Sequence, residues 1–94
     1  MAVVIVNEME GGGQDLYDEV NPKVLEGNKL PDGCQLHIAG PYESGWRVIT
    51  VWDSEDRFQR FRDEKLSPAL REAGGEDRIV PSISTDPVHN LMTA

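Results

Sequence analysis

The sequence predicts an α+β domain whose strands and helices alternate in the order β-α-β-β-α-β. Four segments are rich in β-branched and aromatic residues, as strands are, and these are residues 2–8, 35–39, 46–52 and 79–85. Two other segments repeat apolar residues at helical spacing, and these are residues 14–25 and the stretch after residue 54. A chain of 94 residues fits one compact domain, so we expect a single unit over residues 1–94, with 86–94 as a C-terminal tail.

The first strand and the first helix are separated by three consecutive glycines. Residues 2–8 (AVVIVNE) are mostly apolar, and the glycines end them with a flexible turn. In residues 14–25 the apolar side chains fall on one helical face, but Pro22 removes a backbone donor. We therefore predict a break or a kink in this helix near Val20 and Asn21.

The next two strands predict a hairpin. Residues 35–39 (QLHIA) alternate between polar and apolar types and stop at Gly40 and Pro41. The β-branched and aromatic run 46–52 (WRVITVW) follows after a short turn, so the two strands are expected to pair with each other.

The second helix has start, interruption and end signals of its own. Asp53 or Ser54 is placed to cap its first turn. Ser67, followed by a proline, resembles a second start inside the apolar pattern and predicts a jog in the helix. Gly74 and Gly75 mark its end.

The last strand completes a ferredoxin-like arrangement, in which two helices cover one face of a four-stranded antiparallel sheet. Residues 79–85 contain Pro81, which predicts a bulge or a strand near the edge of the sheet. The first and third strands carry apolar residues at both parities, as strands buried on two faces do. Because the helices hide one face only, we expect a homodimer that packs sheet against sheet.

The charge balance and the cysteine content limit the possible partners. Nine Lys and Arg against seventeen Asp and Glu give a net charge of −8, which disfavours nucleic acid and anionic membranes. The first apolar run is too short for a transmembrane span or a signal peptide. One cysteine, Cys34, cannot form an internal disulfide, so we expect a reducing compartment, the cytoplasm.

Residues 51–58 (VWDSEDRF) form an aromatic-ended strand that runs directly into a capped helix with a phenylalanine near its start. Together with segments 37–41, 45–48 and 87–90, they resemble the dimeric α+β barrel superfamily, in particular its antibiotic biosynthesis monooxygenase-like group. The resemblance implies a dimer with one pocket in each protomer, between its own sheet and the partner. Related proteins use that pocket for cofactor-independent oxygenation, polyketide cyclisation, heme degradation or ligand binding.

The resemblance does not extend to heme or metal ligands. Heme-degrading relatives use an asparagine, a tryptophan and a histidine, and Asn7 and Trp52 match the first two. The histidine is missing, because the second helix contains none. His37 and His89 are far apart in sequence, and with a single cysteine they give no metal-ligand spacing. We therefore predict neither a metal nor a cofactor.

Three residues are candidates for catalysis. His37 lies in an apolar strand and titrates near neutrality, so it is either a base or a hydrogen-bonded structural histidine. Asn7 ends an apolar strand, where its amide either holds a substrate oxygen or simply meets water. Trp52 either offers an indole donor and a stacking surface or anchors the second helix in the core.

Four further residues are candidates for ligand contact. Strand alternation places Trp46 and Thr50 on the same face as Trp52. Tyr17 adds a hydroxyl from the first helix. His89, in the tail, either closes the pocket mouth of its own or the partner subunit or is an exposed terminal residue.

These residues lead to a specific hypothesis. A homodimer oxygenates or cyclises an aromatic or polyketide-like compound without metal or flavin, with His37 as proton acceptor and Asn7 and Trp52 holding the oxyanion. The alternative is a non-catalytic ligand-binding or accessory dimer, since the sequence shows no acid-base pair. A cavity lined by Asn7, His37 and Trp52 would favour catalysis or specific binding over a structural role.

Overall fold

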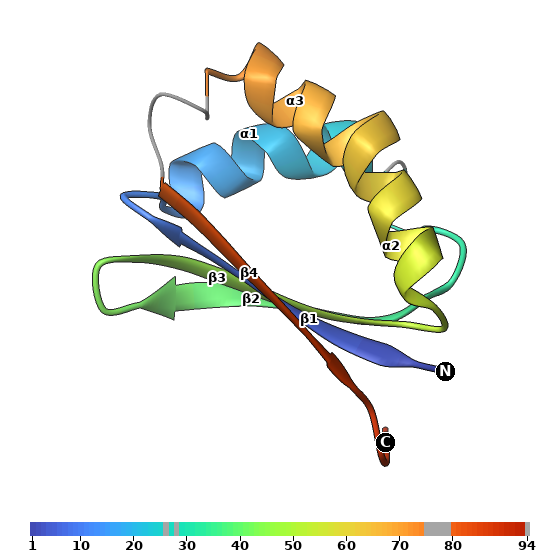
Figure 1. Cartoon of the computed structure of the whole chain (residues 1–94). Helices are drawn as coiled ribbons and strands as arrows, with labels where there is room; N and C mark the ends of the chain where they lie inside the picture. Colours follow the sequence, from blue (N-terminus) through green and yellow to red (C-terminus); the bar gives the residue numbers. More distant parts are fainter. Residues whose placement is uncertain (26, 28, 75–79, 94) are drawn as a thin grey trace.

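The chain folds into one sheet with a layer of helices above it (Figure 1). The computed structural model describes residues 1–25, 27, 29–74 and 80–93. In chain order the elements are β1 (Val3–Glu10), α1 (Gln14–Val24), β2 (Cys34–Tyr42), β3 (Gly45–Trp52), α2 (Glu55–Phe61), the π-helical segment η2 (Arg62–Leu66), α3 (Ser67–Glu72) and β4 (Val80–Pro87). The predicted α+β order β-α-β-β-α-β is therefore confirmed.

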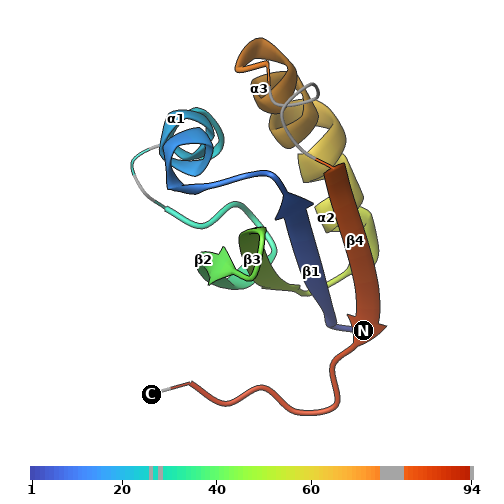
Figure 2. The same cartoon turned by 90° about the vertical axis from the view of Figure 1, so that its left-hand side faces the viewer.

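The four strands form one antiparallel sheet in the order β2-β3-β1-β4. The helix α1 and the run from α2 to α3 lie side by side on the same face of this sheet, as Figure 2 shows. The topology is that of the predicted ferredoxin-like fold, and β4 is an edge strand, as Pro81 indicated. Within the described ranges, no helix has the length and apolar character needed to cross a membrane.

The core lies between the sheet and the helices. Alternate residues of β1 and β3 face the helices, and the pairing of Val3 with Trp52 and of Ile5 with Thr50 keeps them on that face. Trp52 and Ile5 are the largest fully buried side chains. Ten of the eleven buried apolar residues that the structure describes form two clusters, namely Val3, Ile5, Trp52 and Phe58, and Met9, Leu16, Val20, Val24, Leu25 and Ala69. The eleventh, Val51, lies on the opposite face of the sheet and is 4% exposed.

Of the break or kink predicted in the first helix, the break is wrong, because α1 continues through Pro22 to Val24, and the kink stays a prediction. The proline lies beyond the first turn, so it removes the backbone hydrogen bond that residue 22 would donate to the carbonyl of Asp18. Beyond it, the backbone N–H of Leu25 donates to the carbonyl of Asn21 at 2.8 Å. Val20 and Val24 are buried, and this packing holds the turn that contains the proline.

The hairpin of β2 and β3 is longer than predicted, because β2 does not stop at Gly40. Gly40 pairs with Arg47 and Pro41 pairs with Trp46, so only Glu43 and Ser44 connect the strands. A proline is tolerated here because β2 is an edge strand, where one side of the backbone has no partner strand.

The jog predicted at Ser67 occurs as a change of helix type. Ser54 caps α2, its Oγ accepting from the backbone N–H of Arg57 at 3.3 Å. The π-helical segment η2 then widens the helix until α3 begins at Ser67. The helix ends near Gly74, whose φ of 73° is the left-handed conformation that glycine adopts readily. The predicted end residue Gly75 and the strand residue Ile79 lie outside the described residues.

The face of the sheet away from the helices carries apolar side chains beside charged ones such as Glu8 and Arg47. Strand alternation places on it the side chains of Val4, Val6, Leu36, Ile38, Ile49 and Val51. Ile38 is 53% exposed. The C-terminal tail leaves the end of β4 and runs on this side of the sheet, apart from the helices (Figure 2).

Candidate functional site

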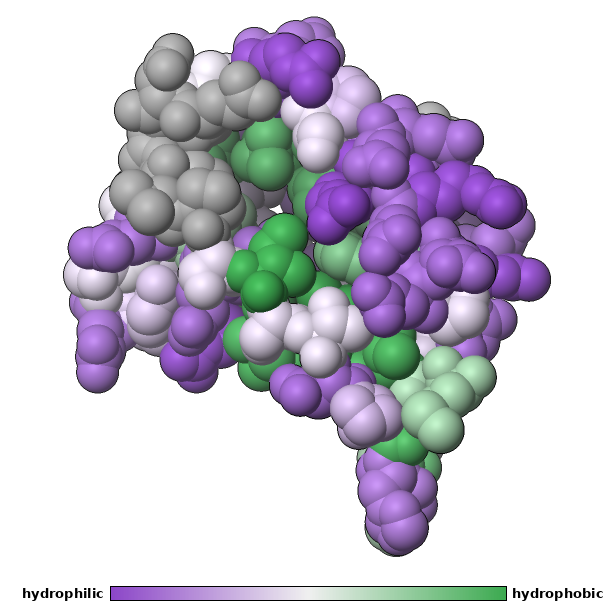
Figure 3. Space-filling view, in the orientation of Figure 1, coloured by the Kyte–Doolittle hydropathy of each residue, from purple (hydrophilic) through white to green (hydrophobic). Residues whose placement is uncertain are grey.

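A cavity of about 70 Å³ lies between the sheet and the helices of one protomer, and not between the sheet and a partner as the resemblance implied. Figure 3 shows apolar side chains in a hollow between the two layers, with hydrophilic side chains covering the helices beside it. Six of the seven predicted site residues line the cavity, namely Asn7, Tyr17, His37, Trp46, Thr50 and Trp52. Most of the remaining lining is apolar, so these few polar groups determine the chemistry of the cavity.

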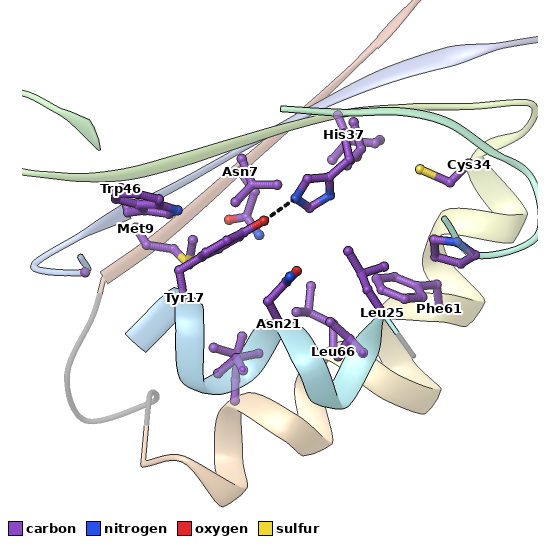
Figure 4. Close-up of a pocket in the computed structure, with 18 of the residues that line it drawn as sticks. Asn7, Met9, Tyr17, Asn21, Leu25, Cys34, His37, Trp46, Phe61 and Leu66 are labelled. Atoms are coloured by element: carbon purple, nitrogen blue, oxygen red, sulfur yellow. Dashed lines mark hydrogen bonds between the residues drawn. The ribbon is translucent and has the colours of Figure 1, made fainter. Parts of the chain in front are cut away.

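The sheet register brings the strand residues together. His37 pairs with Thr50, and Asn7 pairs with Val48, all on the helix-facing side of three neighbouring strands. Tyr17 faces them from α1, one position after the buried Leu16. Figure 4 shows Tyr17 reaching up to the sheet between Trp46 and His37, with Asn7 behind.

Tyr17 and His37 form the central polar contact. The Oη of Tyr17 lies 2.6 Å from Nε2 of His37. Burial lowers the pKa of His37. Burial, followed by the charge of Asp18, raises the pKa of Tyr17. Both side chains are therefore neutral near pH 7, and the imidazole has basic capacity. The sequence placed both residues at the site but gave no signal that they pair.

Two polar atoms in the lining are buried without a hydrogen-bond partner. They are Oδ1 of Asn7, an acceptor, and Nε1 of Trp46, a donor. The ring of Trp46 is tilted against Tyr17 with 5.4 Å between the ring centroids. One donor and one acceptor therefore remain available beside the Tyr17 and His37 pair, as a polar ligand requires.

Trp52 lines the cavity, but its indole N–H is already in use. Its Nε1 donates to Oγ1 of Thr50 at 2.9 Å, and the side chain is 1% exposed. Its ring centroid lies 5.7 Å from that of Phe58 and 5.2 Å from that of Phe61. In this arrangement Trp52 anchors β3 to α2, and the free indole donor belongs to Trp46.

His89 lies apart from the cavity of its own protomer. It is exposed in the tail that follows β4, where the neighbouring Val88 donates its backbone N–H to the carbonyl of Ala2 at 2.9 Å. It is not among the residues that line the cavity. A contact between His89 and the pocket of a partner subunit stays a prediction.

Cys34 contributes a thiol to the wall of the cavity. Burial raises its pKa, so it remains protonated near pH 7 and is a poor nucleophile. In the part of the chain that the structure describes, no three His, Cys, Asp or Glu side chains are grouped as metal ligands. Acid-base chemistry at this cavity therefore centres on the Tyr17 and His37 pair.

Comparison with known proteins places the chain among the antibiotic biosynthesis monooxygenase-like folds. No family model and no curated protein matches the sequence. A variant of SnoaB, a cofactor-independent oxygenase from Streptomyces nogalater, superposes with a TM-score of 0.69 at 14% identity, over 99% of this chain and 98% of that one. A Deinococcus radiodurans protein described as an antibiotic biosynthesis monooxygenase gives 0.62 at 12% identity, over 100% and 98%.

A third solved structure, the protein YjcS, gives a TM-score of 0.63 at 13% identity, over 95% of this chain and 100% of that one. The predicted resemblance is thus confirmed at the level of the fold. The chain has the fold of the antibiotic biosynthesis monooxygenase-like proteins, and its chemistry must be argued from its own cavity.

The unpartnered oxygen of Asn7 leads to a stability prediction. An acceptor buried without a partner costs about 1–3 kcal/mol, so Asn7→Leu should raise the free energy of unfolding by about 1 kcal/mol in urea titrations. Thr50→Val is the control, because it removes an acceptor that Trp52 uses and should lower stability. A loss of stability in Asn7→Leu would show that the amide is held by a partner.

Proposed function

We propose that the protein is a cofactor-independent oxygenase that deprotonates a small, acidic aromatic or enolisable compound in this cavity. The observation that carries the proposal is the neutral Tyr17 and His37 pair, set in an apolar cavity beside unpartnered polar atoms of Asn7 and Trp46. The oxygenase activity in the name of SnoaB, whose fold this chain shares, supports the same reading.

Tyr17 and His37 would remove the proton together. In the tautomer that we infer, the hydroxyl of Tyr17 donates to Nε2 of His37, and the tyrosine oxygen accepts the proton of the substrate. As that proton arrives, the tyrosine passes its own to His37, which becomes imidazolium while Tyr17 stays neutral. Because burial lowers the pKa of His37, the pair suits acidic substrates such as phenols and carbon acids next to carbonyl groups.

The substrate anion would be held by the two open polar atoms. The indole N–H of Trp46 donates to the oxygen on which negative charge develops, and Oδ1 of Asn7 accepts from a hydroxyl of the substrate. This assigns to Trp46 the donor role that the sequence suggested for Trp52.

In the oxygenation that follows, dioxygen is the oxidant and no other is required. The carbanion carbon bonds to dioxygen, and the resulting peroxide takes the proton from His37. Loss of water from the hydroperoxide leaves a carbonyl group. A CH₂ group and dioxygen thus become C=O and water, with all electrons supplied by the substrate carbon. If the carbanion instead attacks a carbonyl of its own molecule, the same base performs a cyclisation that consumes no dioxygen.

Proton removal can be tested with 4-nitrophenol, a phenol acidic enough to exchange its proton with a weakly basic imidazole, whose anion absorbs at longer wavelength than the neutral form. Bound to the protein near pH 7, the probe should ionise more than it does free in buffer, because the indole N–H of Trp46 stabilises the anion and His37 accepts the proton. His37→Ala should return the bound probe to the neutral form, and Tyr17→Phe should lower the ionised fraction. Absorbance spectra, together with binding by equilibrium dialysis, measure both effects.

The control is His89→Ala, which removes the other histidine. An unchanged spectrum is expected for the free tail, whereas a changed one would place the tail at a partner's cavity. A probe that binds but stays neutral in the wild-type protein would support the alternative, a non-catalytic binding protein. With a true substrate, an oxygen electrode separates oxygenation from cyclisation.

We further propose that the protein is a cytoplasmic homodimer. Support for the dimer comes from the apolar side chains on the sheet face that the helices leave open, including Ile38 at 53% exposure. An exposed apolar sheet face is costly in water, and a twofold copy covers it with one repeated interface. Glu8 and Arg47, joined by an ion pair of 2.7 Å on the same face, are placed to fix the register of the two sheets.

A further inference from the structure

A second hollow of different character, which we call the vestibule, lies beside the apolar cavity. The vestibule has a volume of about 510 Å³ and lies where the loop before β2 meets α2 and η2. Val24, Pro31 and Phe61 line both spaces, so the vestibule adjoins the cavity at the end away from Trp46. In Figure 4, Phe61 and Leu25 lie at that end, opposite Trp46 and Met9.

The vestibule differs in charge from most of this acidic chain. In the part of the chain that the structure describes, four cations line it, and they are Lys29, Arg57, Arg60 and Lys65. Two acids among the described residues line it as well, Asp32 and Glu64. A chain with a net charge of −8 repels anions over most of its surface, so this group of cations concentrates anions at one place.

Arg57 is positioned by its neighbours. Its Nε lies 3.6 Å from Oδ1 of Asp53. Its side chain also lies over Gly33, where an added Cβ would collide with Cδ of Arg57 and Oδ1 of Asp53. The absence of a side chain at Gly33 therefore leaves room for the aliphatic part of Arg57, while Asp53 restrains its guanidinium beside the vestibule.

The size of the cavity indicates that the ligand reaches the vestibule. A cavity that holds benzene measures about 150 Å³. The cavity here, of about 70 Å³, cannot enclose even one substituted ring without some opening of its walls. The rest of the molecule must then extend past Phe61 and Pro31 into the vestibule, where the cations are.

We propose that the vestibule binds a carboxylate of the substrate, so that the compound deprotonated in the cavity is a small aromatic or enolisable acid. Among the described lining residues four are cations and two are acids, so the lining attracts an anionic group such as a carboxylate. The planar guanidinium groups of Arg57 and Arg60 match the two oxygens of a carboxylate. This inference rests on the proposed function, because it takes the cavity as the place of reaction.

The test compares 2-naphthol with 6-hydroxy-2-naphthoate, which share the acidic hydroxyl and differ in the carboxylate. At low salt the wild-type protein should bind the carboxylate probe about tenfold more tightly, and about 0.5 M salt should remove most of that preference. The double variant Lys29→Gln/Arg60→Gln should lose most of the preference while its affinity for 2-naphthol is unchanged. Equilibrium dialysis gives all of these affinities.

The matched control is Arg62→Gln, which removes a cation from the same helical run outside the vestibule, where Arg62 pairs with Asp63 at 3.4 Å. It should keep the preference for the carboxylate. Equal losses in Arg62→Gln and the double variant, or equal binding of both probes by the wild-type protein, would overturn the vestibule assignment and leave the cavity standing. Failure of both probes to bind would overturn the proposed function together with this inference.

Discussion

Replacing Trp52 with alanine is expected to lower the free energy of unfolding by about 3–5 kcal/mol, the range for large aromatic residues in a core. Trp52 is 1% exposed, packs on Phe58 and Phe61, and holds Thr50 through its indole N–H. In a domain of this size such a loss lowers the melting temperature by well over 10 °C, at about 4–8 °C per kcal/mol.

The other tryptophan provides the matched comparison. Trp46 is only partly buried and its Nε1 has no acceptor, so Trp46→Ala removes less packing and no hydrogen bond. Urea unfolding should show a clearly smaller loss at Trp46 than at Trp52. Trp52→Phe keeps an aromatic ring and should fold even where the alanine variant does not.

For binding of 2-naphthol the order of the two tryptophans is reversed, and the change at Trp46 should have the larger effect. Trp52→Phe should bind the probe nearly as the wild-type protein does, whereas Trp46→Phe, which removes the open donor, should bind it several-fold more weakly. Weaker binding in Trp52→Phe than in Trp46→Phe would restore the oxyanion role that the sequence suggested for Trp52.

The sequence could predict the faces of the strands because alternation is a local property. The shared face of Trp46, Thr50 and Trp52 follows from the parity of their strand, and these residues meet Asn7 and His37 because the register aligns the three strands. The order of elements and the edge position of β4 were likewise readable from periodicity and from one proline.

Pairing between side chains was not readable, because it depends on distances between distant segments. Nothing near Tyr17 in sequence indicates that its hydroxyl meets a ring twenty residues away. Trp46 and Trp52 lie on the same face of β3, so alternation does not distinguish them. Thr50 accepts the indole N–H of Trp52, and the indole N–H of Trp46 is left without an acceptor. The vestibule combines a loop with two helical segments, so its charge is dispersed in the sequence.

The break predicted in α1 was wrong for a related reason. A propensity argument counts the hydrogen bond that Pro22 removes, but it does not count the burial of Val20 and Val24 on either side. Tertiary packing supplies most of the stability of a short helix, so it overrides the local preference. The proline at Pro41 is tolerated on other grounds, because β2 is an edge strand.

Ile38→Glu is expected to convert the proposed dimer into monomers. Ile38 is 53% exposed in a single protomer, so the charge costs little in the folded monomer. In a symmetric dimer two glutamates would enter one apolar interface, and burial of unpaired charges should weaken association at least about a hundredfold. Sedimentation velocity at micromolar concentration should show a particle of 10.5 kDa for the variant and twice that mass for the wild-type protein.

Leu30→Glu is the matched control, because Leu30 is also an exposed apolar residue, at 46%, but lies at the vestibule and away from the open sheet face. It should remain dimeric, and its added negative charge should weaken binding of the hydroxynaphthoate probe. Dissociation by both variants would point to a general loss of solubility or fold. A wild-type protein that sediments as a monomer would contradict the dimer and leave the open face of the sheet for another partner.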